Sequence, residues 1–225
     1  MELKETKIGC FLAVPDLISL LNLTFGFLAI LMALNEEIAI SAMFIIVALI
    51  FDSVDGWVAR KLSRNDEYGF GKNIDSLADI VSFGIAPGVL LYALGNSYSL
   101  EISYLSAIIA LFIAISGVLR LTRFNVICDK IEFEGFVGVP IPATGLLIAT
   151  LFLSGFFNIY LAMILMVIFG FLMISTVKYK KTNNMAILAI AGLLVILTII
   201  PYKIAIFGVN IPATLLFIIT LSYAF

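Results

Sequence analysis

The sequence contains no histidine and only two cysteines, and just 12% of its 225 residues are charged. Without histidine, imidazole acid–base catalysis, histidine metal ligands and a phosphohistidine intermediate are all excluded, so proton transfer falls to Asp, Glu, Lys or Tyr. Cys10 and Cys128 have neither the spacing of a metal site nor that of a disulfide framework, so we interpret both as incidental thiols. The net charge of −2, with no basic tail, gives no indication of a nucleic-acid partner.

Apolar residues are what the chain has in excess. Hydrophobic residues make up 63% of it and the mean hydropathy is +1.18, whereas soluble domains are nearer half apolar. A helix that crosses a bilayer needs roughly 20 apolar residues, and runs this long and uniform predict helices. We therefore expect an all-α integral membrane protein, a single domain over residues 1–225, with a bundle of about eight transmembrane helices. The predicted runs cover residues 11–34, 38–59, 74–94, 100–121, 139–153, 157–177, 185–200 and 204–225.

Basic residues alternate regularly with these runs. In an eight-helix arrangement all but one of the lysines and arginines fall on one side of the membrane, and only Lys203 falls on the other. The positive-inside rule assigns the basic side to the cytoplasm, so we expect both termini to be cytoplasmic. Residues 1–10 are either an interfacial segment or a solvated tail that leads into the first helix. The residues on the basic side are Lys4, Lys7, Arg60, Lys61, Arg64, Lys72, Arg120, Arg123, Lys130, Lys178, Lys180 and Lys181.

Four aspartates form a pattern at the end of the second run and the start of the third. At 100° per residue, Asp52 and Asp55 share one helical face, and Asp75 and Asp79 share a face of the next helix. Four anions cannot sit together in a poorly hydrated place without cations. An all-oxygen shell without His or Cys selects hard ions such as Mg²⁺, Mn²⁺ or Ca²⁺. The same faces also carry Gly56, Ala59, Arg60 and Gly71.

Two other interpretations of the aspartates stay open. They can be ordinary helix-end charges that pair with Arg60, Arg64 and Lys72. They can also be the ion site of a cation transporter, although the acids cluster at one membrane surface and the helices lack the paired Gly/Pro breaks of inverted repeats. Four acids at this spacing, with glycines on the same faces, favour the metal site over both.

Together the two segments resemble the signature of the CDP-alcohol phosphatidyltransferases. That signature is Asp-x-x-Asp-Gly-x-x-Ala-Arg followed by Gly-x-x-x-Asp-x-x-x-Asp, and every defining position is filled. The resemblance implies that Asp52, Asp55 and Asp75 hold two divalent metal ions, Mg²⁺ or Mn²⁺, with Ca²⁺ as a non-productive occupant. It also implies that Asp79 ligates one of these ions and takes the proton from the acceptor hydroxyl. CMP is the implied leaving group.

The same resemblance implies a binding site for a CDP-activated lipid, either CDP-diacylglycerol or its ether-linked equivalent. Gly56 would let the nucleotide approach the helix backbone, and Ala59 is small either for the same reason or for close helix packing. Arg60 either contacts the donor or balances the aspartates. Asn22 and Thr24 either contact the nucleotide or form hydrogen bonds between helices. The implied donor-binding residues are Gly56, Ala59, Arg60, Gly71, Asn22 and Thr24.

Further segments resemble the phosphatidylserine synthase branch of that family. They read Arg-Leu-x-Arg-Phe-Asn from Arg120, Phe-x-Gly-x-Pro-x-Pro-Ala from Phe136, and Ser-Phe-Gly-x-x-Pro from Ser82. The implied acceptor is L-serine, whose carboxylate Arg120 or Arg123 would clamp. Both arginines fit the basic bias of any cytoplasmic loop equally well. The implied acceptor-binding residues are Arg120, Arg123, Asn125, Gly138, Pro140 and Pro142.

From the residues themselves, the acceptor stays open between serine and two phosphorylated alcohols. Glycerol 3-phosphate or inositol phosphate would demand a dense basic pocket, which Arg120, Arg123 and Lys130 can supply. The apolar helix faces do not report whether the donor carries acyl or archaeal ether chains. The resemblance further implies a homodimer and a multi-pass protein of the cell membrane with its active site on the cytoplasmic side.

Overall fold

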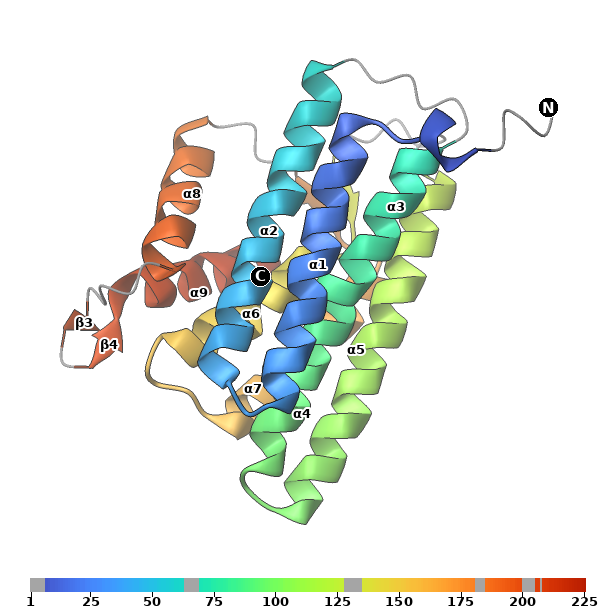
Figure 1. Ribbon diagram of the computed structural model, residues 1–225. Coiled ribbons are helices and arrows are strands. Elements are labelled where there is room, and N and C mark those ends of the chain that lie inside the picture. Colours follow the sequence, from blue (N-terminus) through green and yellow to red (C-terminus); the bar gives the residue numbers. More distant parts are fainter. Residues whose placement is uncertain (1–6, 63–68, 128–134, 181–184, 200–204, 207) are drawn as a thin grey trace.

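The computed structural model describes residues 7–62, 69–127, 135–180, 185–199, 205, 206 and 208–225. Within these ranges the protein is built from helices, with two short antiparallel strand pairs (Figure 1). β1 (Gly135–Val137) pairs with β2 (Lys178–Lys180), and β3 (Ala205–Ile206) pairs with β4 (Val209–Asn210). The helices are α1 (Val14–Leu34), α2 (Ile38–Lys61), α3 (Phe70–Asp79), α4 (Ala86–Asn96), α5 (Leu100–Ile127), α6 (Pro142–Leu153), α7 (Ile159–Ile174), α8 (Met185–Ile199) and α9 (Ile211–Ala224), with a 3₁₀ turn η2 (Ile8–Cys10) and a π-helical segment η3 (Ile80–Ile85).

Each of the eight predicted apolar runs contains a helix, so the all-α prediction is confirmed for the described residues. Within the described part of the chain, four helices are long and apolar enough to cross a membrane: α1, α2, the continuous α3–η3–α4 helix Phe70–Asn96, and α5. At 1.5 Å per residue, the 21 residues of α1 span about 31 Å, close to the thickness of a bilayer core. The later helices are shorter, and the last predicted run, 204–225, contains only the 14-residue α9 after the β3–β4 pair. The eight crossings therefore stay a prediction, and of the predicted interfacial segment 1–10, residues 1–6 lie outside the described ranges.

Several helix ends are set by local side chains. Asp16 in the first turn of α1 accepts a hydrogen bond from the Ala13 backbone N–H at 2.8 Å, which satisfies a donor that the helix leaves unpaired. At the start of α7, the Asn158 side chain accepts from the backbone N–H groups of Tyr160 and Leu161. These hydrogen bonds explain why α1 begins at Val14 and α7 at Ile159.

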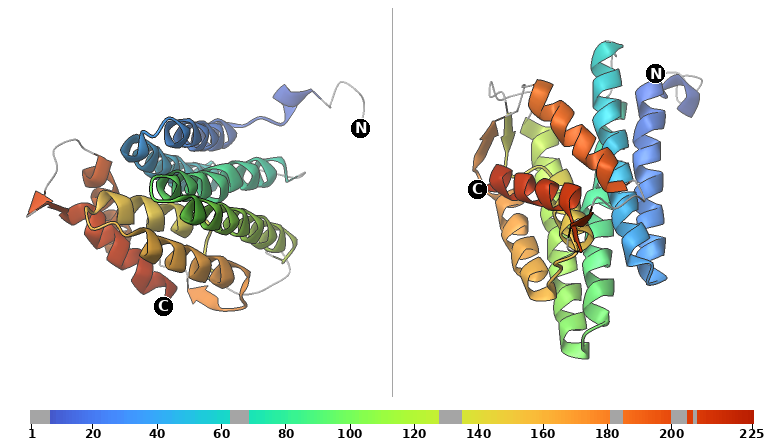
Figure 2. Two further views of the ribbon diagram at one scale, coloured as in Figure 1. Left: turned by 90° about the horizontal axis from the view of Figure 1, so that it is seen from below. Right: turned by 90° about the vertical axis from the view of Figure 1, so that its left-hand side faces the viewer.

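The α3–η3–α4 helix occupies the centre of the molecule. Seen from below, it lies between the α1–α2 pair and the later helices (Figure 2, left). Of its most apolar stretch, 61% is buried, against 28–33% in α1, α2 and α5. The side view shows α9 lying crosswise to the long helices (Figure 2, right). The two helices that carry the aspartates are thus the paired α2 and the central α3.

The central helix widens into the π-helical segment directly after Asp79. Pro87, about two turns after Asp79, has no N–H and cannot donate to the Phe83 carbonyl as a normal helical residue would. The hydroxyl of Thr144 in α6 lies 2.7 Å from that carbonyl and can donate to it from the neighbouring helix. Short π-helical segments inside α-helices occur frequently at functional sites.

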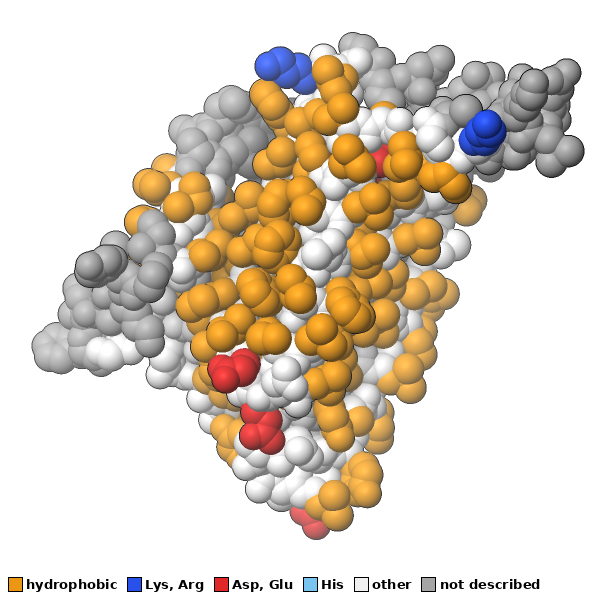
Figure 3. Space-filling view, in the orientation of Figure 1, with side chains coloured by type: hydrophobic (Ala, Val, Ile, Leu, Met, Phe, Trp, Pro, Cys, Tyr) orange, Lys and Arg blue, Asp and Glu red, His pale blue; other side chains and the backbone are white. Residues whose placement is uncertain are grey.

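The outer surface has the distribution of side chains that a bilayer requires. Figure 3 shows apolar side chains along the length of the long helices, with the visible Lys and Arg at one end and most of the visible Asp and Glu toward the other. The basic end is the one where α2 ends and α3 begins (Figures 1 and 3). Such an apolar band between polar ends fits contact with lipid rather than with water.

Candidate functional site

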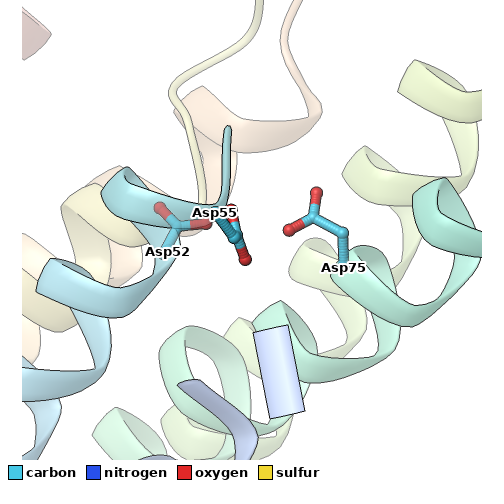
Figure 4. A group of neighbouring side chains, drawn as sticks. All are labelled: Asp52, Asp55 and Asp75. Atoms are coloured by element: carbon cyan, nitrogen blue, oxygen red, sulfur yellow. The ribbon is translucent and has the colours of Figure 1, made fainter. Parts of the chain in front are cut away.

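Three of the four aspartates converge between α2 and α3. Asp52 and Asp55 come from adjacent turns of α2, and Asp75 reaches toward them from α3 (Figure 4). One carboxylate oxygen from each of the three lies within 4.8 Å of the others. The helical spacing that placed these residues on facing surfaces therefore brings them together in space.

The chemistry of this group fits divalent cations. Asp55 is only 5% exposed, and Asp52 and Asp75 are half-buried. Oδ1 of Asp75 is buried and accepts no hydrogen bond from any described residue. An acceptor left without a donor in such a place is costly unless a cation or another ligand completes it. Carboxylate oxygens alone, at this mutual distance, suit a hard ion such as Mg²⁺ or Mn²⁺.

Asp79 lies one turn along α3 and is not part of this group of three. It is 6% exposed, and its Oδ1 accepts a hydrogen bond from Nδ2 of Asn22 in α1 at 3.1 Å. Its carboxyl group is also within hydrogen-bonding reach of Asp52. Asp79 therefore stands beside the three-carboxylate group, in a different set of contacts.

Ser19 is a site residue that sequence reasoning did not identify. Its hydroxyl donates to Oδ2 of Asp55 at 2.7 Å, and both side chains are buried. Ser19 lies three residues before Asn22, so both point from one face of α1 toward the carboxylates. That spacing was the only available signal, and it is too common in helices to single out a serine.

The other predicted donor-binding residues lie around this end of α2 and α3. Gly56 and Ala59 are half-buried in the last turns of α2, and Gly71 is buried in the first turn of α3. Arg60 belongs to α2, but its side chain lies outside the described part of the chain. Thr24 is exposed, and its hydroxyl donates to the Leu20 carbonyl of its own helix at 2.7 Å.

Arg120 in α5 is a cation that faces the carboxylates. Its side chain is 5% exposed, and its charge interacts with those of Asp79 and Asp52. The guanidinium lies 5.5 Å from the ring centre of Phe124 and 5.8 Å from that of Phe136, within the range of cation–π interactions. Its Nε is buried and has no hydrogen-bond partner among the described residues. The ring centres of Phe124 and Phe136 are 6.4 Å apart, so this planar donor lies against a pair of neighbouring rings beside the aspartates.

Arg123 is engaged differently from Arg120. Its guanidinium donates to the backbone carbonyls of Val137, Met173 and Ile174 at 2.8–2.9 Å, which ties the end of α5 to β1 and to the end of α7. Gly138 follows directly, with a left-handed φ of 78°. A Cβ there would overlap the Met173 carbonyl oxygen.

Asn125, Pro140 and Pro142 complete the predicted acceptor set. Nδ2 of Asn125 donates to the Ser76 hydroxyl at 2.9 Å, so the end of α5 is bonded to the helix that carries Asp75. Pro142 opens α6, and the Pro140 carbonyl accepts from the Ala143 N–H at 3.1 Å. The Asn125 bond thus joins α5 to α3, and the Pro140 carbonyl takes part in the first turn that leads into α6.

The chain is similar to known proteins over most of its length. The sequence profile described as CDP-alcohol phosphatidyltransferase matches residues 12–177, a range that contains every predicted site residue. The chain is 39% identical over 183 residues to archaetidylserine synthase of Methanothermobacter thermautotrophicus, covering 81% of this chain and 76% of the relative. It is 41% identical over 177 residues to the CDP-diacylglycerol–serine O-phosphatidyltransferase of Methanocaldococcus jannaschii, covering 77% and 76%. The enzyme of that name from Bacillus subtilis is 34% identical over 173 residues, covering 77% and 93%.

Proposed function

Because the chain belongs to the CDP-alcohol phosphatidyltransferase family, we propose that it transfers the phosphatidyl or archaetidyl group of a CDP-activated lipid to the hydroxyl of L-serine and releases CMP. The names of its relatives in archaea and bacteria support serine as the acceptor. The observation that carries the proposal is the group of three carboxylates between α2 and α3, faced by the buried guanidinium of Arg120. The carboxylates can hold metal ions for the phosphate-linked donor, and the guanidinium can pair with the carboxylate of the acceptor.

Two divalent metal ions belong to this proposal, and the family generally uses such ions. Asp52, Asp55 and Asp75 would hold them, with Asp79 as a ligand to one. When bound, Mg²⁺ or Mn²⁺ neutralises the donor's pyrophosphate and polarises the phosphorus under attack. Ca²⁺ has the same preference for oxygen but a looser coordination geometry, so it would occupy the site without supporting transfer.

Asp79 is the proposed general base. It takes the proton from the serine hydroxyl as the serine oxygen forms a bond to the lipid-linked phosphorus. The bond from that phosphorus to the bridging oxygen of CMP breaks, and CMP leaves with the electron pair. The transfer is direct, which agrees with the absence of histidine as a nucleophile. The buried position of Asp79 beside the group of three supports this assignment.

The donor nucleotide is proposed to lie over the end of α2. Gly56, Ala59 and Gly71 present little side chain there, so a nucleotide can approach the backbone of both helices. Oδ1 of Asn22 is buried and has no hydrogen-bond partner among the described residues, so it can accept from the donor. Thr24 and Arg60 are the remaining donor contacts of the proposal.

Arg120 is the proposed partner of the serine carboxylate. A guanidinium presents a planar fork that matches a carboxylate, and the unmet Nε of Arg120 is one arm of that fork. Arg123, Asn125, Gly138, Pro140 and Pro142 shape the same end of the pocket, since Arg123 and Asn125 bond its walls together. Glycerol 3-phosphate or inositol phosphate is the alternative acceptor in this position.

The membrane arrangement is part of the proposal. Eight crossings with both termini in the cytoplasm would place the carboxylates at the cytoplasmic surface, where CDP-lipid headgroups and serine meet. The gathering of Lys and Arg at this end of the molecule supports that orientation (Figure 3). A homodimer is also expected and is tested by cross-linking in the membrane.

The test is CMP release by the purified protein in detergent. CDP-diacylglycerol and its ether-linked counterpart are each supplied with Mn²⁺ or Mg²⁺, and L-serine, glycerol 3-phosphate, inositol phosphate and no acceptor are compared. We expect release that depends on both metal and serine. Release with a different acceptor would overturn serine while keeping the family's reaction. No release from folded protein with either lipid would favour cation transport instead.

A further inference from the structure

One face of α1 reaches the carboxylates of both neighbouring helices. The Ser19 hydroxyl donates to Asp55 of α2 at 2.7 Å, and the Asn22 amide donates to Asp79 of α3 at 3.1 Å. The two donors are three residues apart and therefore one turn apart on the same face. Among the described contacts, α1 thus makes one hydrogen bond to the three-carboxylate group and one to the aspartate beside it.

The Ser19 hydroxyl has two possible hydrogen-bond acceptors, and the Asp55 carboxylate is the stronger one. Its oxygen also lies 3.3 Å from the Pro15 carbonyl, the usual acceptor for a serine inside a helix. The hydroxyl has one hydrogen, and the carboxylate is both nearer and charged, so the bond to Asp55 is favoured. Ser19 is 4% exposed and Asp55 is 5% exposed, so water does not compete for the bond.

Asn22 is fixed from two directions. The Ser82 hydroxyl of η3 donates to the Asn22 backbone carbonyl at 2.9 Å, one turn beyond the bond to Asp79. At Gly26 the two helices approach so closely that a Cβ would lie 2.6 Å from the Ser82 Cα. The backbone of α1 at Asn22 therefore cannot shift without disrupting the close contact between α1 and η3. This fixes the position from which the Asn22 amide donates to Asp79.

We propose that Ser19 and Asn22 are positioning residues, with Ser19 orienting Asp55 for metal binding and Asn22 orienting Asp79 for proton transfer. The inference rests on the proposed function, in which Asp55 binds metal and Asp79 takes the proton from the substrate. Groups that bond to metal ligands fix ligand orientation, and their loss typically lowers metal affinity or activity about 10- to 100-fold. The two residues act on different carboxylates. Loss of Ser19 should therefore lower the affinity for metal, and loss of Asn22 should lower kcat.

The first measurement is Mn²⁺ binding to the purified protein without substrates, followed by the electron paramagnetic resonance signal of free Mn²⁺. Ser19→Ala is expected to weaken binding about 10- to 100-fold, and Ser19→Thr, which keeps the hydroxyl, to restore most of it. Ser41→Ala is the matched control. Ser41 of α2 is equally buried and donates to the Ala29 carbonyl of α1 at 2.8 Å, so its loss removes a similar helix–helix bond that involves no carboxylate.

The second measurement is steady-state CMP release at saturating Mn²⁺. Asn22→Leu is expected to lower kcat about 10- to 100-fold, whatever rise in the KM for the CDP-lipid the loss of its Oδ1 brings. A raised KM with kcat unchanged would make Asn22 a donor contact alone and overturn its positioning role. Ser41→Ala should change neither constant.

The outcomes separate this inference from the function on which it rests. Wild-type protein that binds no Mn²⁺ would contradict the metal site itself. Wild-type binding that Ser19→Ala leaves unchanged would overturn the role of Ser19 alone. If Ser19→Ala does not fold, Ser19→Cys takes its place, because a thiol fills the same space and donates only weakly. Folding is checked for each variant by its melting temperature in detergent.

Discussion

The guanidinium of Arg123 donates to the Met173 carbonyl at 2.8 Å, so a charged group from the end of α5 terminates α7. The same guanidinium binds two further backbone carbonyls. Arg120, one turn earlier, has no hydrogen bond at its Nε to any described residue and faces the aspartates. Two arginines that look alike in the sequence therefore divide into one that holds the fold and one that is available to a ligand.

This division predicts opposite phenotypes for two matched substitutions. Arg120→Lys should raise the KM for serine about 10- to 100-fold, since a lysine cannot reproduce a two-armed bond to a carboxylate worth about 1.5–3 kcal/mol. Arg123→Lys should instead lower stability by about 1–3 kcal/mol, because one ammonium cannot reach all three carbonyls. Serine kinetics and melting temperature measured on both variants check the pair. A KM effect of equal size in Arg123→Lys, with unchanged stability, would place Arg123 on the acceptor.

Much of the architecture could be predicted because hydropathy and helical periodicity are local properties. The apolar runs located the helices, and the spacing of Asp52, Asp55 and Asp75 located the group of three. The helix ends were less accurate: α5 continues to Ile127 and the central helix begins at Phe70, beyond the apolar runs. Hydropathy reports the length inside the hydrocarbon, whereas a helix can continue into water.

Contacts between distant segments could not be predicted in the same way. Periodicity shows that Ser19 and Asn22 share a face, but not that the face meets α2 and α3. Likewise, nothing local in the sequence indicates that Arg123 will meet carbonyls about fifty residues away. Such roles depend on which helices pack together, and that is a property of the whole fold.

Because Asp79 lies outside the group of three, its replacement is expected to lower the rate of transfer more than the affinity for metal. Asp79→Asn should lower kcat by about 10²- to 10⁴-fold, the usual contribution of a general base, while Mn²⁺ binding falls much less. Asp55→Asn should lose both, since Asp55 belongs to the group of three. Glu37→Gln, at the exposed turn between α1 and α2, is the control and should change neither. Near-normal transfer by both aspartate variants would contradict the site.

Metal removal gives a prediction that does not depend on turnover. Mn²⁺ at a hundred times its Kd should stabilise the fold by about 2.7 kcal/mol, measured as a higher melting temperature in detergent. Chelation should reverse the shift and stop CMP release. Asp75→Asn should abolish most of the shift, because the unmet Oδ1 of Asp75 is one of the oxygens offered to the ion. Ca²⁺ should raise the melting temperature without supporting release. A shift that persists in Asp75→Asn would place the ion elsewhere.

Gly138 offers a test of the segment that Arg123 binds through the carbonyls of Val137 and Met173. Its φ of 78° disfavours any side chain, and an added Cβ would overlap the Met173 carbonyl oxygen and lie 2.6 Å from Nη2 of Arg123. Gly138→Ala should therefore cost more than about 1 kcal/mol of stability. It should also raise the KM for serine more than that for the CDP-lipid, since the displaced segment borders the proposed acceptor pocket. Gly192→Ala in α8 is the matched control, because a Cβ there meets no atom within 4 Å. A Gly138→Ala protein as stable as the Gly192→Ala protein would show that the segment around Gly138 can move without loss of stability. The inference that Arg123 holds this segment rigidly would then be wrong.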